Sequence, residues 1–322
     1  MSRSKVEVET APVGKFEYAA LFARALMALP RLLAEQKLPP KLHRPFQTLP
    51  ELRQVLIQEE AAVRSIYESL KEKKIALAGL EHFPALAEHL QNGGKLFFLG
   101  PHWSVVDIMA FELALEQLRA VNPEQQEVIN FYVPTSSKFY DARLGTLGAL
   151  LNLFAISPLP VIQPGDKNFT EKEASDRNMQ TYRQIITALK NPGQAVGFFP
   201  QTTRNIGQAT TQKAYEETMA IIRGKWRDEN TLVVPFAVHG AYEVAGKGRI
   251  PDLRHHLTIQ YCPPITYPRL EQLAAELGVG HAEVPVIIGL ATMPRQYWGI
   301  YEEAVEGYLQ LQQFVSGAGG KK

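Results

Sequence analysis

His102 and Asp107 are the residues of this chain whose types and spacing best suit catalysis. His102 follows the short apolar run Lys95–Leu99 (KLFFL) and the turn pair Gly100 and Pro101, so we expect it just after a buried strand. Asp107 lies five residues further on, where an amphipathic helix is expected to begin. A histidine with a neighbouring carboxylate can act as a general base whose orientation is set by the acid.

The same segment also fits a purely structural interpretation. Ser104 and Asp107 have the spacing of a capping box, in which the two side chains bind free backbone amides of the first helical turn. Asp107 could therefore serve the helix start, the histidine, or both. These residues alone leave both interpretations open.

A second candidate group follows the predicted strand Ala195–Pro200 (AVGFFP). Thr202, Thr203 and Arg204 offer two hydroxyls and a planar guanidinium with five donors, which suits a phosphate. Lys213 could add a point charge. A surface loop and a solvated lysine would have the same composition, so the alternative to an anion site is an ordinary loop.

The elements around these residues indicate an α/β fold. Short apolar, β-branched or aromatic runs predict strands at Lys95–Leu99, Glu127–Val133, Phe154–Ile162, Ala195–Pro200, Thr231–Val238 and His256–Tyr261. Helical patterns start near Ser104, cover Met179–Leu189 and return from Arg269 to Val315. The alternation predicts a mixed, mostly parallel central sheet covered by helices. Ligands of such sheets bind outside the carboxyl ends of strands, so the two candidate groups are expected to face one cleft.

Residues 1–92 are predicted to form a separate, small all-helical domain, and residues 93–322 the α/β domain. Amphipathic patterns over Phe16–Glu35 and Leu52–Lys73 are separated by a proline-rich linker, and a third helix starts at Pro84 and stops at Gly93. The apolar helix faces could pack on the main domain, which we favour, or contact a membrane surface peripherally.

Composition excludes several classes of protein. A net charge of +1 provides no field that would recruit nucleic acid. The single Cys262 permits no intramolecular disulfide and no cysteine-based zinc site, which is typical of a reducing compartment. Residues 1–15 mix charges and indicate no signal peptide. The uncharged segment Leu144–Gly165 is broken by prolines, so we expect a buried helix and strand there. The protein is then expected to be soluble, in the cytoplasm or in a compartment like the plastid stroma.

Three landmarks in order resemble the glycerolipid acyltransferase family, which includes glycerol-3-phosphate and lysophosphatidate acyltransferases. That family has a His, four residues and an Asp, then a Phe-Pro-Glu-Gly-Thr-Arg-Ser segment, then a Val-Val-Pro strand. The matching residues are His102 and Asp107, then Phe199, Pro200, Thr203 and Arg204, then Val233, Val234 and Pro235.

The layout is most similar to the soluble plastid-type glycerol-3-phosphate acyltransferases, because a helical segment precedes the α/β part. The resemblance covers roughly residues 95–264. The chain departs from the family at Gln201, Thr202 and Asn205, where the family has Glu, Gly and Ser. The family's intermediate motif, which contains an Arg, has no recognisable counterpart.

The resemblance implies a transferase of phospholipid biosynthesis and lipid metabolism. Such an enzyme moves a fatty acyl group from an acyl carrier protein or coenzyme A thioester to a hydroxyl of glycerol 3-phosphate or a lysophospholipid, with no metal and no cofactor. Alternatives are an acyltransferase with a non-phosphorylated acceptor, and a non-catalytic acyl-carrier or lipid-binding protein on the same fold.

Each candidate residue has a role in this interpretation. His102 would be the general base, Asp107 its orienting acid, and Arg204 with Lys213 the grip on the acceptor phosphate, beside Thr202 and Thr203. Backbone amides near Trp103 and Ser104 could meet the oxyanion at the positive end of the helix.

Overall fold

We analysed a computed structural model of the chain. It describes residues 75–123, 129–136, 157–162, 169–201, 204–205, 212–219, 222–223, 227, 229–245 and 255–318. The helices expected before residue 75, the helix expected over Leu144–Leu153, and the candidate residues Thr202 and Thr203 lie outside these ranges. All described elements belong to one compact unit, formed by residues 72–140 and 154–322.

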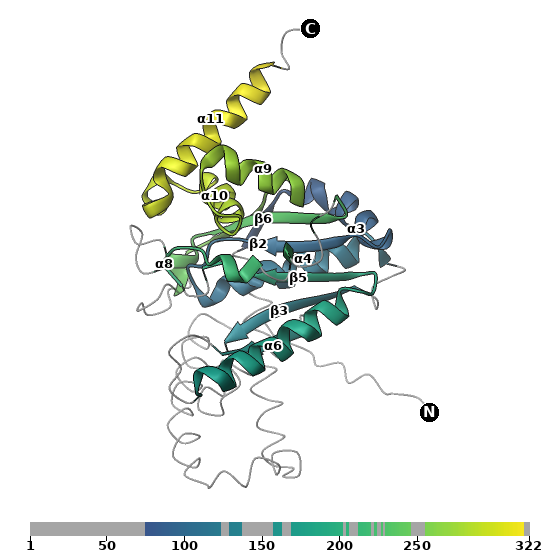
Figure 1. The fold of residues 1–322 in the computed structure, drawn as a ribbon. Coiled ribbons are helices and arrows are strands. Elements are labelled where there is room, and N and C mark those ends of the chain that lie inside the picture. Colours follow the sequence, from purple (N-terminus) through teal and green to yellow (C-terminus); the bar gives the residue numbers. More distant parts are fainter. Residues whose placement is uncertain are drawn as a thin grey trace, which may run out of the picture. The chain divides into compact units, whose positions relative to one another are not determined.

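A mixed, eight-stranded sheet forms the centre of this unit, as the sequence predicted (Figure 1). Its order is β1-β7-β6-β2-β5-β3-β4, with β8 paired to β6. Strands β2 to β6 are parallel to one another, whereas β7 and β8 pair with β6 in antiparallel fashion and β1 runs parallel to β7. The strands are β1 (Ile75–Ala78), β2 (Lys95–Leu99), β3 (Asn130–Ser136), β4 (Ser157–Val161), β5 (Gln194–Phe198), β6 (Thr231–His239), β7 (Leu257–Tyr261) and β8 (Ile265–Thr266).

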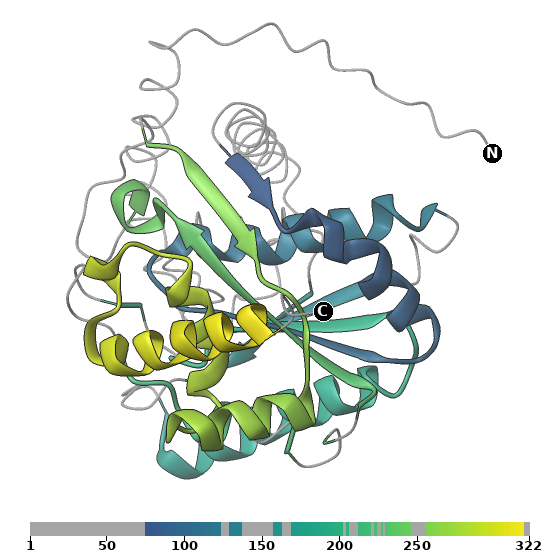
Figure 2. The same cartoon turned by 90° about the horizontal axis from the view of Figure 1, so that it is seen from above.

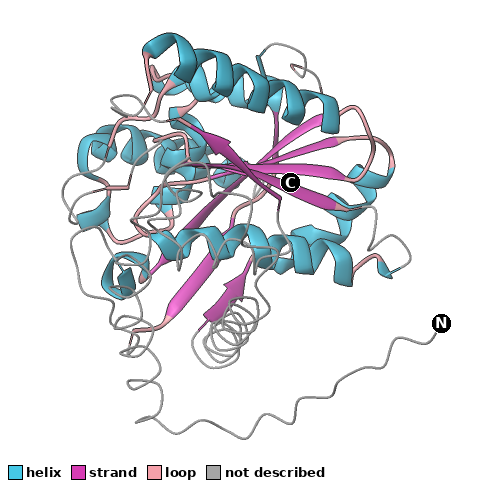
Figure 3. Ribbon diagram, turned by 90° about the horizontal axis from the view of Figure 1, so that it is seen from below, coloured by secondary structure: helices cyan, strands magenta, loops and turns pink. Residues whose placement is uncertain are grey.

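Helices cover both faces of the sheet (Figures 2 and 3). Helices α3 (Phe83–Gln91) and α4 (Met109–Ala120) lie together on one face, and α6 (Glu171–Ala188) and α9 (Tyr267–Leu277) lie on the other (Figure 2). Helix α10 (Glu283–Ala291) packs on β6 and on α11 (Glu302–Ala318). The double cover explains why every residue of the central strands β2 and β5 is buried. Within the described residues, no helix combines the length and the apolar character needed to cross a bilayer.

The expectation that the chain is all helical up to residue 92 is wrong at β1. Residues Ile75–Ala78 form a strand that pairs with β7. A four-residue apolar run has no periodicity that separates a strand from the end of a helix. The chain turns sharply at Gly79, with φ 79°, and a Cβ there would lie 1.9 Å from the Tyr261 carbonyl oxygen. β3 also extends past its predicted end at Pro134, to Ser136.

The chain leaves β2 and β5 in opposite directions along the sheet. From β2 it passes through α4 to β3, beyond β5, and from β5 it continues to β6, on the other side of β2. Neighbouring parallel strands that part in this way open a crevice at their carboxyl ends, the usual place for a ligand in an open α/β sheet. The short helix α8 (Ala241–Ala245), which follows β6, marks this edge in Figure 1.

Gly197, in the middle of β5, makes room for an aromatic core beneath that edge. A Cβ on Gly197 would lie 2.4 Å from the Phe111 ring and 2.5 Å from the Phe131 ring. Phe111 in turn packs on Phe199, with ring centroids 5.0 Å apart. The absence of a side chain at residue 197 therefore lets the rings below the edge come close together.

We expect Gly197→Ala to lower the free energy of unfolding by about 1–3 kcal/mol, because the added methyl overpacks the ring cluster. Denaturant unfolding measures this loss. Gly307→Ala in α11 is the control, since its Cβ would meet only the flexible end of Leu277 at 3.3 Å. Alanine favours helix, so that control should be neutral or stabilising. Equal unfolding curves for Gly197→Ala and the unmodified chain would contradict the packing argument.

Candidate active site

Gly100 and Pro101 carry the chain from the end of β2 to His102. Gly100 passes so close to β6 that a Cβ on it would lie 2.4 Å from the Phe236 carbonyl oxygen. Gly289 of α10 packs on the same carbonyl, and a Cβ there would also come within 2.9 Å of the Pro101 ring. The tight packing of these small residues fixes the direction in which the chain leaves β2.

His102 and Asp107 are joined by a hydrogen bond, as their spacing suggested. His102 Nδ1 lies 3.0 Å from Asp107 Oδ2. The Asp107 side chain is completely buried, whereas that of His102 keeps 18% of its surface exposed. With Nδ1 donating its proton to the carboxylate, Nε2 carries the free lone pair and can accept a proton.

Asp107 Oδ2 accepts two further hydrogen bonds, from the backbone. The Trp103 N–H donates to it at 2.5 Å and the Ser104 N–H at 2.8 Å. Ser104 Oγ accepts from the Val106 N–H at 3.3 Å and also from the Asp107 main chain. Together with the Ser104 N–H bond to Asp107, the Asp107 main-chain bond completes the predicted capping box at the first turn, Val105–Ile108. The capping interpretation is confirmed, and the same carboxylate oxygen also holds the imidazole. The catalytic role stays a prediction.

The expectation that the amides of Trp103 and Ser104 stabilise an oxyanion is wrong. Both N–H groups already donate to Asp107 Oδ2. A backbone N–H bound to a buried carboxylate is not free to meet a charge that develops during a reaction. The Asp107 carboxylate and an oxyanion would compete for the same two donors, and Asp107 holds them.

The imidazole plane is fixed by Phe199. The two rings are stacked nearly parallel, with centroids 4.1 Å apart and an angle of 9° between their planes. Phe199 itself packs against Phe111 and against Phe236, so it cannot easily swing away. From the sequence, Phe199 is recognisable only as a member of the motif, and its contact with the imidazole is visible only in the structure.

Gln201 and Asn205, in the segment after β5, contact the main chain of His102, which places the intervening Arg204 near the His102 loop. The His102 N–H donates to Gln201 Oε1 at 2.8 Å, and the Asn205 N–H donates to the His102 carbonyl at 2.7 Å. Gln201 and Asn205 are both fully buried. In the sequence they stood out only as departures from the family's pattern.

Arg204 and Lys213 lie near this junction and carry positive charge. Arg204 is half-buried and precedes Asn205, while Lys213 is exposed. The segment with Lys213 is anchored by two hydrogen bonds, from the Tyr215 N–H to the Pro200 carbonyl at 2.9 Å and from the Ala214 N–H to Tyr301 Oη at 2.7 Å. Neither cation forms an ion pair within the part of the chain that the structure describes.

Two other side chains that could be reactive, His239 and Cys262, lie in surroundings that indicate a structural role. His239 ends β6, and its Nε2 lies 3.2 Å from Thr292 Oγ1. Burial lowers the pKa of His239, which disfavours its charged form. Cys262 is buried, and burial raises the pKa of its thiol to about 12, so it is unreactive at neutral pH, in agreement with the structural role predicted for it.

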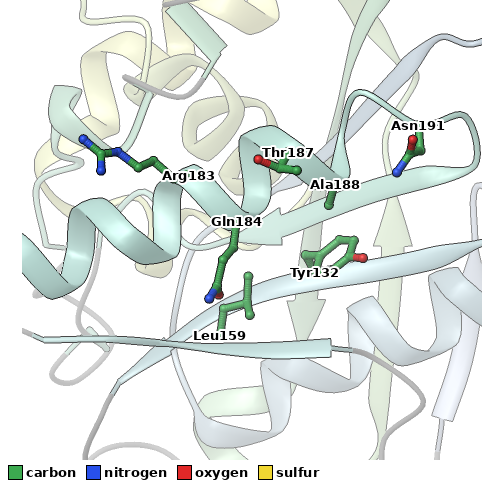
Figure 4. Close-up of a pocket in the computed structure, with 7 residues that line it drawn as sticks. All are labelled: Tyr132, Leu159, Arg183, Gln184, Thr187, Ala188 and Asn191. Atoms are coloured by element: carbon green, nitrogen blue, oxygen red, sulfur yellow. The ribbon is translucent and has the colours of Figure 1, made fainter.

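A pocket of about 510 Å³ lies on another part of the molecule, between α6 and the strands β3 and β4 (Figure 4). Its lining residues are Tyr132, Leu159, Arg183, Gln184, Thr187, Ala188 and Asn191. Neither His102 nor Arg204 belongs to this lining. The candidate catalytic residues therefore lie at the edge of the sheet and not in this pocket.

Comparisons with known proteins leave the family unassigned. No family model matches the chain, and no curated protein matches it. Among solved structures, the 1-acyl-sn-glycerophosphate (LPA) acyltransferase PlsC from Thermotoga maritima matches with 14% sequence identity and a TM-score of 0.38, over 78% of this chain and 84% of that one. A similarity of this size carries no weight for function, which therefore has to come from the site itself.

The three hydrogen bonds on Asp107 Oδ2 predict different outcomes for two substitutions. In Asp107→Asn, the amide oxygen can take the place of Oδ2 and keep all three donors. Asp107→Ala leaves two buried backbone N–H groups and the imidazole without an acceptor, at about 1–3 kcal/mol for each unpaired group. We therefore expect Asp107→Ala to lower the free energy of unfolding by several times as much as Asp107→Asn, measured by denaturant unfolding. Equal losses would contradict the assigned geometry.

Proposed function

We propose that this protein is an O-acyltransferase that moves an acyl group from a thioester to a hydroxyl of a phosphorylated acceptor. The observation that carries the proposal is the hydrogen bond between His102 Nδ1 and the buried Asp107, at the carboxyl ends of the neighbouring strands β2 and β5. The order of the three sequence landmarks agrees with it. The donor would be a thioester of acyl carrier protein or coenzyme A, and the acceptor glycerol 3-phosphate or a lysophospholipid.

His102 would activate the acceptor. Its Nε2 removes the proton from the acceptor hydroxyl as the oxygen attacks the thioester carbonyl carbon, and Asp107 stabilises the imidazolium that forms. The carbon–sulfur bond then breaks, and the leaving thiolate takes the proton back from Nε2. The products are an ester and a free thiol, and the histidine returns to its starting state. General-base assistance of this kind contributes about 10²–10⁴-fold to the rate.

The transfer would be direct, without an acyl-cysteine intermediate. Cys262 is the single cysteine of the chain, it is buried, and its raised pKa of about 12 keeps the thiol protonated. Donor and acceptor would then bind together beside His102, so the kinetics should be sequential. Phe199 and Asp107 hold the imidazole in one plane during both proton transfers.

Arg204 and Lys213 would bind the acceptor phosphate and so bring its hydroxyl to His102. A guanidinium matches the geometry of phosphate oxygens, and a lysine adds a point charge. Arg204 is covalently next to Asn205, whose N–H contacts the His102 carbonyl, so the cation and the base belong to one small region. Thr202 and Thr203 complete the proposed acceptor loop.

We expect His102→Ala to lower the rate of acyl transfer by about 10²–10⁴-fold while the protein stays folded, because the general base is lost. The measurement is release of free thiol from an acyl thioester in the presence of glycerol 3-phosphate. Parallel reactions with a lysophospholipid and with glycerol identify the acceptor class. His89→Ala, on α3, is the control, and near-normal turnover by His102→Ala would rule out the base assignment.

We expect Arg204→Ala to raise the acceptor KM by about 10–100-fold, as the loss of a charge-assisted hydrogen bond implies. The KM of the acyl donor should change little. Arg183→Ala on α6 removes a comparable charge from a distant surface and should leave both constants unchanged. A change confined to the donor KM would contradict the proposed phosphate contact.

A further inference from the structure

Two buried carboxamides join the acceptor loop to the loop that carries His102. We call Gln201 and Asn205 the amide pair. Gln201 Oε1 accepts from the His102 N–H at 2.8 Å, and Gln201 Nε2 donates to the Gln212 carbonyl at 2.5 Å and to Asn205 Oδ1 at 3.2 Å. The side chain of Gln201 therefore links main-chain groups that lie far apart in the sequence.

Asn205 completes the network from the other side. Its Nδ2 donates to Gln201 Oε1 at 3.3 Å, and its Oδ1 accepts from the Gln212 N–H at 2.6 Å. Its main-chain N–H donates to the His102 carbonyl at 2.7 Å. The amide pair thus binds both the N–H and the carbonyl of His102. In the two side chains, each amide oxygen accepts a hydrogen bond and each amide nitrogen donates one.

The network requires neutral amides. A carboxylate at residue 201 could still accept from the His102 N–H, but it has no hydrogen to donate to the Gln212 carbonyl or to Asn205 Oδ1. It would place a buried negative charge against two acceptor oxygens, which is unfavourable. Gln201 and Asn205, which stand where the resembling family has Glu and Ser, satisfy each other as neutral amides.

We propose that Gln201 and Asn205 are positioning residues that fix the His102 base relative to the phosphate-binding Arg204. This inference rests on the proposed function. We call the hydrogen bonds between the amide pair and the His102 main chain the lock. The N–H that binds the His102 carbonyl belongs to the peptide bond between Arg204 and Asn205, so the lock connects the base directly to the residue that carries the cation. Misplacement of a reacting group by about 1 Å can cost about 10²-fold in rate, so loss of the lock should act on kcat.

The principal test is Gln201→Met, which keeps the length of the side chain and removes all of its hydrogen bonds. We expect kcat for thiol release to fall about 10–100-fold, while the KM values of donor and acceptor change less than about threefold. Gln310→Met on the exposed side of α11 is the matched control and should keep normal constants. A fall in kcat shared by the control, or an unchanged kcat in Gln201→Met, would overturn the proposal.

A second readout does not depend on activity. The Phe199 ring, stacked 4.1 Å from the imidazole, should shift the proton resonances of the His102 ring in NMR spectra, and His102→Gln identifies those signals. In folded Gln201→Met the shift should shrink, because the imidazole leaves the stack; unchanged His102 signals would overturn the lock. If the unmodified protein transfers no acyl group but the shift still depends on Gln201, the proposed function fails and the lock stands.

Gln201→Glu tests the requirement for a neutral side chain, and serves if Gln201→Met does not fold. Burial among acceptors raises the carboxyl pKa in the folded state above its unfolded value of about 4.3. The Gln201→Glu variant then loses stability as pH rises from that value through the folded pKa. At pH 8 its melting temperature should lie below that of the unmodified protein, and the difference should shrink towards pH 5. A difference that does not change with pH would overturn the neutrality argument.

Discussion

The candidate site depends on one oxygen atom, Asp107 Oδ2. It accepts the Nδ1 proton of His102 and the N–H groups of Trp103 and Ser104, and its side chain is fully buried. The same three hydrogen bonds begin a helix and orient an imidazole. The start of the helix and the geometry of the base are therefore coupled. When the segment folds as observed, the histidine is placed with it. When the His102 ring turns away, the buried Asp107 Oδ2 loses one of its donors.

This constraint explains where the site can lie in the fold. β2 and β5 are neighbours whose following connections depart in opposite directions, which leaves room above their carboxyl ends. His102 comes from the first strand, and Phe199, Gln201 and Asn205 follow the second. The stacked ring and the two main-chain hydrogen bonds join these segments. The site is thus assembled from two segments that the sheet places side by side and that these contacts hold together.

The sequence predicted the elements whose signal is local. The apolar run of β2 has the predicted bounds, and the capping box was visible as Ser104 and Asp107. β1 was missed because four apolar residues carry no periodicity, and only its pairing with β7 makes it a strand. The occupied amides of Trp103 and Ser104 were misjudged for a related reason, since spacing shows which donors exist but not which acceptor reaches them.

Gln201 shows how a departure from a motif can be read in physical terms. By comparison with the resembling family it replaces an acid, and sequence alone leaves that change without a cause. In the structure its amide faces one donor main-chain N–H and two acceptor oxygens, a pattern that an amide satisfies and a carboxylate does not. Asn205 changes with it because its own amide supplies one of those oxygens and a second donor. Gln201 and Asn205 therefore act as one neutral unit that binds both polar groups of the His102 main chain.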